Sequence, residues 1–243
     1  MRNVGFAVLL TVLVSGAAGA YRGPSTIVIR QDAPAASRVP ADLGRLSRPI
    51  AVADMAQARA AASDALKMVL PMISAADFRS FGFEKAADVE GATLGAPIAT
   101  VFIPQDKLSA YENGTDPAST LEDDGGLIFP VRAASKVVCG IFMDNAGGTW
   151  KMVGFGKSEK VQEITATRKA VAASAKVRPA TLFAVEAPSL SVTFIGRISG
   201  GKLLLTPISD DPVLGLKANT ESRAEDTFTR LAPLARDARA MGQ

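Results

Sequence analysis

The 243-residue chain contains no histidine. This absence excludes catalytic triads with a histidine base, histidine-ligated zinc sites and histidine pH switches. Cysteine occurs once, at position 139, so neither an intrachain disulfide nor a thiolate metal cluster can form. Aromatic residues make up 6% of the chain, and its basic residues are spread out rather than clustered between aromatics. We therefore expect no nucleic-acid partner.

The composition is that of a chain that buries a core. Hydrophobic residues make up 48% of it and charged residues 21%, which is typical of globular proteins and not of disordered tails. A chain of this length can form one large domain or two small ones.

Residues 1–20 have the organisation of an export signal. Arg2 supplies a positive charge, Val4 to Val14 form an uncharged and mostly apolar run, and small residues follow up to Ala20. The run is shorter than the roughly 20 residues of a membrane span, which favours cleavage after Ala20 over an uncleaved anchor. We expect a periplasmic or secreted protein that is not integral to a membrane once the signal is removed.

Charge and proline content divide the rest of the chain. Residues 21–50 are rich in proline, which predicts an arm or linker. Residues 51–150 carry seven basic and thirteen acidic side chains, and residues 151–243 carry fourteen basic and nine acidic. We predict an acidic α+β lobe over 51–156 and a basic α+β lobe over 157–243, and complementary charge would help them to dock.

The hydrophobic periodicity predicts helices over residues 51–70 and 158–176. Capping patterns at Ser74 and Ser222 predict a short helix that stops near Gly82 and a last helix bent at Pro233. The polar stretch 105–126 is predicted to be a loop. Strands are predicted at 98–103, 127–131, 136–143, 149–155, 181–185, 190–198 and 202–208.

These strands occur in hairpins rather than alternating singly with helices. The order predicts an α+β fold in which helices pack on an antiparallel sheet built from hairpins, and not a doubly wound parallel sheet. Cystatin-like domains, with a helix on a curved antiparallel sheet, offer an analogy of fold alone. The similar segments Ala99–Phe102 and Ala180–Phe183 allow two similar lobes.

Gly156-Lys157-Ser158 follows a strand and opens a helix, as a phosphate-binding loop does. The full pattern needs a glycine five residues earlier, where Lys151 stands, so we interpret Ser158 as a helix N-cap and expect no nucleotide.

An acidic loop offers hard oxygen ligands among glycines, which suits calcium. The proposed ligands are Asp116, Glu122, Asp123 and Asp124. Solvated loop carboxylates are the alternative, and no EF-hand spacing is present. A carboxylate-based hydrolase would require two of these acids, or Glu112, to converge with one raised pKa.

Two further residues have a structural and a functional interpretation. Cys139 stands in an apolar strand, where a buried thiol is inert, so we expect core packing. Trp150 begins a hairpin strand and is either a core aromatic or the wall of a site for a small apolar ligand between helix and sheet.

The stretch from Leu94 to Gly156 resembles a group of uncharacterised exported bacterial proteins. The matching residues are Leu94–Pro97, Val101–Ile103, Leu108, Tyr111, Phe129–Val131 and Gly148–Gly156. The resemblance implies a periplasmic α+β module and transfers no catalytic residue.

Because no motif encodes chemistry, we expect a non-catalytic protein without a cofactor that binds or assembles with another protein of the bacterial envelope. The carboxylate-based hydrolase and the carrier of a small apolar ligand are the alternatives. Thr26-Ile27-Val28-Ile29 is the predicted binding segment, because it can add as a strand to a sheet edge of the same chain or of a neighbour.

Overall fold

The structure, a computed structural model, describes residues 26–27, 39–40, 52–123, 125–145 and 148–241. Its helices are α2 (Val52–Val69), α3 (Ala87–Glu90), α4 (Gln105–Ser109), α5 (Pro117–Thr120), α6 (Ser158–Ala175) and α7 (Ala224–Met241), with short 3-10 turns η1 (Leu70–Met72), η2 (Phe78–Phe81), η4 (Pro179–Thr181) and η5 (Pro188–Leu190). Its strands are β1 (Thr26–Ile27), β2 (Val39–Pro40), β3 (Thr93–Leu94), β4 (Ile98–Phe102), β5 (Glu122–Asp123), β6 (Leu127–Ala133), β7 (Lys136–Asp144), β8 (Lys151–Gly156), β9 (Phe183–Ala187), β10 (Val192–Ser199), β11 (Lys202–Pro207) and β12 (Ser222–Arg223).

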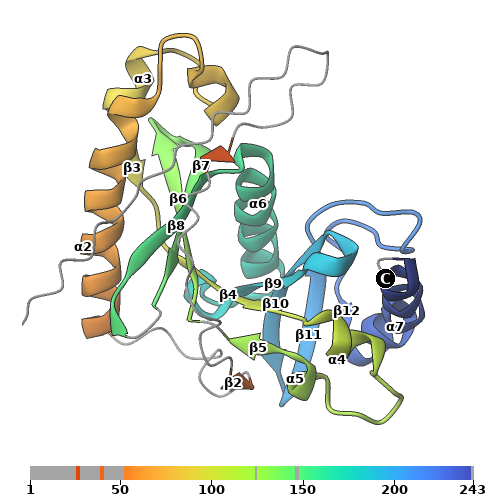
Figure 1. The fold of residues 1–243 in the computed structure, drawn as a ribbon. Helices are drawn as coiled ribbons and strands as arrows, with labels where there is room; N and C mark the ends of the chain where they lie inside the picture. The colour runs from red at the N-terminus through yellow and green to blue at the C-terminus, as the bar shows by residue number, and fades with distance from the viewer. Residues whose placement is uncertain (1–25, 28–38, 41–51, 124, 146–147, 242–243) are drawn as a thin grey trace, which may run out of the picture.

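These strands form one 12-stranded sheet, whose main path runs in the order β1-β8-β7-β6-β4-β9-β10-β11-β12. Neighbours on this path are antiparallel except β4 and β9, which pair in parallel with Val101 opposite Val185. Helices pack on both faces of the sheet (Figure 1). The predicted α+β fold, with an antiparallel sheet built from hairpins, is therefore confirmed.

Strand β4 joins the two halves of the sheet. Ile98 and Ala99 pair with β6, and Thr100 to Phe102 pair with β9. Four strands follow outward from β4 on each side, β6-β7-β8-β1 on one and β9-β10-β11-β12 on the other. The sheet is thus continuous across the predicted boundary at residue 156, and independent folding of the two lobes stays a prediction.

Helix α6 lies in the bend of the sheet, where it covers strands of both halves (Figure 1). Its Val161, Ile164 and Val171 pack with apolar side chains of β4, β6, β9 and β10. The opposite face of the sheet carries two separate clusters, one under α2 and one under α4 and α7. Both faces are therefore buried, which explains the nearly continuous apolar runs of the central strands.

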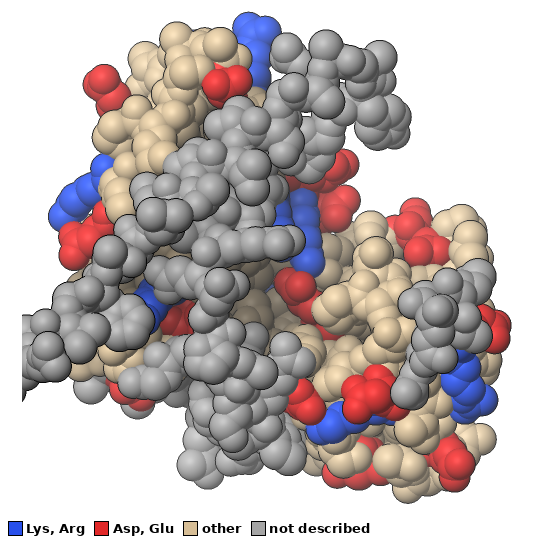
Figure 2. Space-filling view, viewed as in Figure 1, with Lys and Arg blue, Asp and Glu red and all other residues tan. Residues whose placement is uncertain are grey.

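The two halves of the sheet are joined by this apolar cluster and by the β4–β9 ladder. Lys107 pairs with Glu122 at 3.1 Å, both within the predicted lobe 51–156, and Lys160 pairs with Glu186 at 3.0 Å, both within the predicted lobe 157–243. Figure 2 shows acidic and basic side chains interspersed on the face that it draws. These two ion pairs therefore do not join the predicted acidic lobe to the predicted basic lobe.

Three local predictions were wrong. The predicted loop 105–126 contains α4, α5 and β5, because helices this short leave no periodic pattern and Asp116-Pro117 is a helix start rather than a turn. Ser222 does not cap α7, since it pairs in β12 and its Oγ lies 2.8 Å from Thr227 Oγ1. The segment after Ser74 forms only the 3-10 turn η2, although it does end at Gly82 as predicted.

Candidate functional site

The outer edge of β8 is the candidate site. On its inner side β8 pairs with β7, and on its outer side only its last two residues have a partner in the described structure, which is β1. Thr26 lies opposite Gly156, and Ile27 lies opposite Phe155. Among the described residues, no strand pairs with the outer side of residues 151–154. An edge of this kind presents main-chain donors and acceptors to an added strand.

A β-bulge shapes this edge. Phe142 lies opposite Gly154 and Met143 opposite Met152, so Val153 is an extra residue on β8. The bulge places Met152 and Phe155 in the same cluster under α2 and leaves the Val153 side chain 39% exposed. Because a bulge bends and twists its strand, it limits the length of a strand that can continue along β8.

The described part of β1 pairs with β8 over two residues. Neither Thr26 nor Ile27, nor Ser25 and Val28 beside them in the sequence, has a charged side chain. A backbone hydrogen bond contributes about 1 kcal/mol net, whereas fixing the backbone of one residue costs about 1–2 kcal/mol. For these two residues, the main-chain hydrogen bonds and the cost of ordering the backbone are therefore of similar size.

At the opposite end of the main path, an ion pair lies beside the covering strand. There β12 pairs with β11, and Arg197 donates two hydrogen bonds to the carboxylate of the adjoining Glu221, at 2.6 and 2.7 Å. The chain then enters α7 directly at Ala224. A bidentate pair adds both strength and geometric specificity. A charged pair of this kind is ruled out for Thr26 and Ile27 of β1, because their side chains are uncharged.

The turn after β8 differs from the predicted N-cap. Gly156 ends the strand, Lys157 stands before the helix with a φ of 51°, and Ser158 is the first helical residue. The Ser158 hydroxyl donates to the carbonyl of Ser80 at 3.4 Å and does not cap α6. The Lys157 amino group instead lies 4.8 Å from the centroid of the Phe142 ring on β7.

The predicted binding segment is placed only in part. Thr26 and Ile27 form β1, whereas Val28 and Ile29 lie outside the described residues. The predicted arm meets the body a second time at β2, where Val39 lies opposite Asp123. Thr26 and Ile27 therefore cover an edge of their own sheet, which was one of the two roles expected for them.

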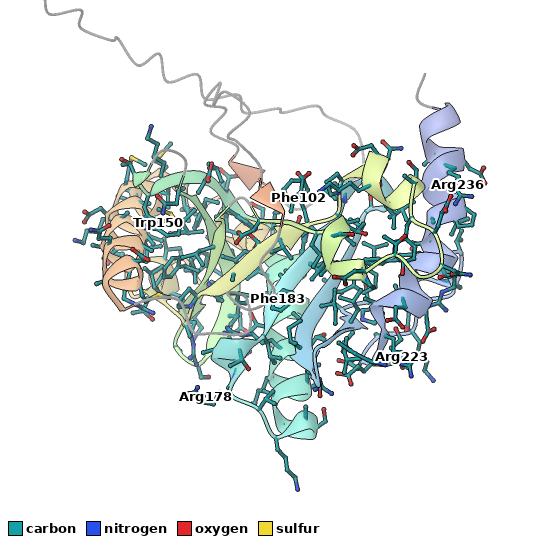
Figure 3. All side chains as sticks on the ribbon, turned by 90° about the horizontal axis from the view of Figure 1, so that it is seen from below. Phe102, Trp150, Arg178, Phe183, Arg223 and Arg236 are labelled. Atoms are coloured by element: carbon teal, nitrogen blue, oxygen red, sulfur yellow. The ribbon has the colours of Figure 1, made fainter. Side chains whose placement is uncertain are left out.

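Trp150 precedes β8 and is half-buried against the cluster under α2. Figure 3 shows its side chain beside α2. Ala58, Ala62 and Phe129 of the same cluster are fully buried, so apolar side chains fill the layer between α2 and the sheet. Trp150 thus borders a packed layer, and this packing gives the apolar-carrier alternative no support.

The acidic residues of the predicted calcium site are used separately. Asp116 accepts a hydrogen bond from Ala118 N at 3.0 Å as the cap of α5, and Glu122 pairs with Lys107. Asp123 is buried and accepts from Gly125 N at 2.8 Å, while Asp124 lies outside the described residues. Within the described ranges, no group of three or more acidic or cysteine side chains is placed to hold a metal ion.

Cys139 is fully buried in β7, where the sequence placed it. Burial raises the pKa of its thiol and so disfavours the reactive thiolate. Sequence reasoning missed Arg168, which is 7% exposed on α6 and donates from Nε to the Pro179 carbonyl at 2.9 Å. Burial lowers the pKa of Arg168 to about 10, so it remains charged at neutral pH. No spacing in the sequence marks it as buried.

No protein-family model, curated protein or solved structure matches this chain. Within the described residues, none of the helices combines the length and the apolar character needed to cross a membrane.

Proposed function

We propose that this chain is a non-catalytic exported protein of the bacterial envelope that binds or assembles with another envelope protein through the outer edge of β8. Its ligand is an extended polypeptide segment that adds to the sheet as a further strand. The observation that supports this most is the pairing of β1, a segment remote in sequence, with Phe155 and Gly156 at that edge.

Strand addition suits this edge for two reasons. Main-chain hydrogen bonds supply affinity without a preformed pocket, and alternate side chains supply specificity. The described part of the covering strand is two residues long and uncharged, so a ligand that pairs with more of β8 can replace it. The bulge at Val153 restricts the ligand to a short strand and thus opposes open-ended sheet growth.

Proline substitutions in β1 test the proposal on the full chain. Thr26→Pro with Ile27→Pro should release β1, because proline lacks the N–H donor and fits poorly in a paired strand. A fluorescent peptide with the sequence of residues 24–31 should then bind saturably to the variant, measured by anisotropy. Binding to the unsubstituted chain should be at least about tenfold weaker, because its own β1 competes.

A peptide that carries the same two prolines is the matched control, and we expect no saturable binding from it. The proposal is wrong if the sequence of residues 24–31 fails to bind the released edge, or if both peptides bind equally.

A further inference from the structure

We propose that the segment that adds to β8 has an acidic–apolar–acidic pattern, with carboxylate side chains on both sides of an apolar residue. This inference rests on the proposed function, because it specifies the chemistry of the strand that β8 accepts. Three consecutive acceptor residues define the pattern: Gly154, Phe155 and Gly156.

The middle position favours an apolar side chain. Residues directly opposite each other in antiparallel strands share a face of the sheet. Phe155 faces the cluster under α2, is fully buried, and has its ring centroid 5.3 Å from that of Phe81. The ligand residue opposite Phe155 therefore lies at the border of that cluster, and Ile27 holds this position in the present structure.

The two flanking ligand positions, opposite Gly154 and Gly156, lie on the other face of the sheet, which α6 covers. A Cβ atom at Gly154 would lie 3.6 Å from the Phe142 ring, and one at Gly140, which is opposite Gly156, would meet Val161 of α6. Neither Gly154 nor Gly156 has a side chain with which to contact the ligand residue opposite it. The chemistry on this face comes instead from neighbours of these glycines.

Lys157 supplies that chemistry as a positive charge. It follows Gly156 directly, is exposed, and holds its amino group over the Phe142 ring, next to Gly154 in the ladder. In the part of the chain that the structure describes, no carboxylate lies within ion-pair distance of Lys157. A cation over a ring face keeps N–H donors free for an anion, so a carboxylate on an added strand can pair with the Lys157 amino group.

Strand β1 matches this acidic–apolar–acidic pattern at its apolar position only. Ile27 provides the apolar residue opposite Phe155, but Thr26 brings no charge to the position opposite Gly156. A segment with carboxylates at the flanking positions would keep an apolar residue opposite Phe155 and add an anion for Lys157. Charge complementarity of this kind gives an envelope partner an advantage over the arm of the chain itself.

The test compares three peptides on the full chain that carries Thr26→Pro and Ile27→Pro. The first peptide has the sequence of residues 24–31, the second replaces its positions 26 and 28 with glutamate, and the third replaces them with lysine. At low ionic strength the glutamate peptide should bind about three- to tenfold more tightly than the first, and the lysine peptide more weakly. High salt should remove these differences.

Two lysine variants locate the effect. Lys157→Gln should abolish the preference for the glutamate peptide, whereas Lys202→Gln, at an exposed lysine that begins β11, should leave it unchanged. A preference that survives Lys157→Gln overturns the inference, because it would then arise from overall charge. Equal or weaker binding of the glutamate peptide also overturns it and makes the arm sequence, from the same or a second copy, the better occupant. Binding of none of the three peptides overturns the proposed function itself.

Discussion

Replacing Phe228 with alanine is expected to lower the free energy of unfolding by about 3–5 kcal/mol. Phe228 projects from α7, is fully buried, and packs edge-on to Tyr111 with ring centroids 5.4 Å apart. Its cluster connects α4 and α7 to the half of the sheet that contains β9 to β11. Truncation removes the apolar contacts of the ring and leaves a cavity between α7 and the sheet. Urea unfolding followed by circular dichroism should therefore show the lower free energy of unfolding.

Val213→Ala is the matched control for this substitution, because Val213 is 85% exposed and should change stability by no more than about 0.5 kcal/mol. The single tryptophan, Trp150, packs in the other half and provides a second probe. Since α6 packs on both halves, Phe228→Ala should shift both transitions together. A shift in circular dichroism with unchanged Trp150 fluorescence would instead indicate lobes that unfold separately, and a loss below about 1 kcal/mol would contradict the account of this cluster.

Gly82→Ala is expected to cost about 2–5 kcal/mol of stability. Gly82 ends η2 with a φ of 84°, and an added Cβ would lie 2.3 Å from the backbone carbonyl oxygen of Val138 and 3.1 Å from Ser158 Cβ. The clash involves the backbone of β7 and the start of α6, which cannot move aside as a flexible side chain can. Thermal unfolding of the variant and the parent gives the measurement.

Gly114→Ala separates the two causes of this loss. Gly114 has a φ of 91°, similar to that of Gly82, but nothing lies within 4 Å of the added Cβ. The conformational strain alone should therefore cost about 1–2 kcal/mol. Equal losses at the two positions would show that the close approach of Gly82 to β7 contributes nothing.

The sequence predicted the main helices and strands because their signals are local. The periodicity of α2 and α6 and the turn residues between β10 and β11 depend on neighbours in the chain, and the structure places these elements within a few residues of the predictions. The apolar run around Cys139 likewise predicted its burial. The hairpin pattern was sufficient to choose the α+β class.

The remaining features depend on contacts between distant residues. The parallel pairing of β4 with β9 could not be derived from the echo between Ala99–Phe102 and Ala180–Phe183, because the ladder places Thr100 opposite Ala184 and not opposite Thr181. The bulge at Val153 follows from its register with β7, and simple alternation would have placed Met152 and Phe155 on opposite faces.

The pairing of Thr26 and Ile27 with a sheet edge was predicted, but which edge they cover was not. The segment from Thr26 was expected to add to a sheet edge, yet nothing in its sequence selects β8 over the other edges. That choice depends on which strand the fold leaves at the end of the sheet. The contact of Lys157 was also hidden from the sequence, because it is made with Phe142 on the neighbouring strand.

Amide hydrogen exchange at Phe155 and Gly156 tests the central claim, that the outer edge of β8 accepts a replaceable strand. Successive residues of a strand point their N–H groups in opposite directions, so one of these two amides faces β1. In the variant that carries both Thr26→Pro and Ile27→Pro, that amide should exchange roughly five- to tenfold faster, and it should recover its protection when the peptide of residues 24–31 is added. The exchange rate of the Ile141 amide on β7 should stay unchanged. Equal exchange with and without the prolines, or no recovery with the peptide, would contradict the account.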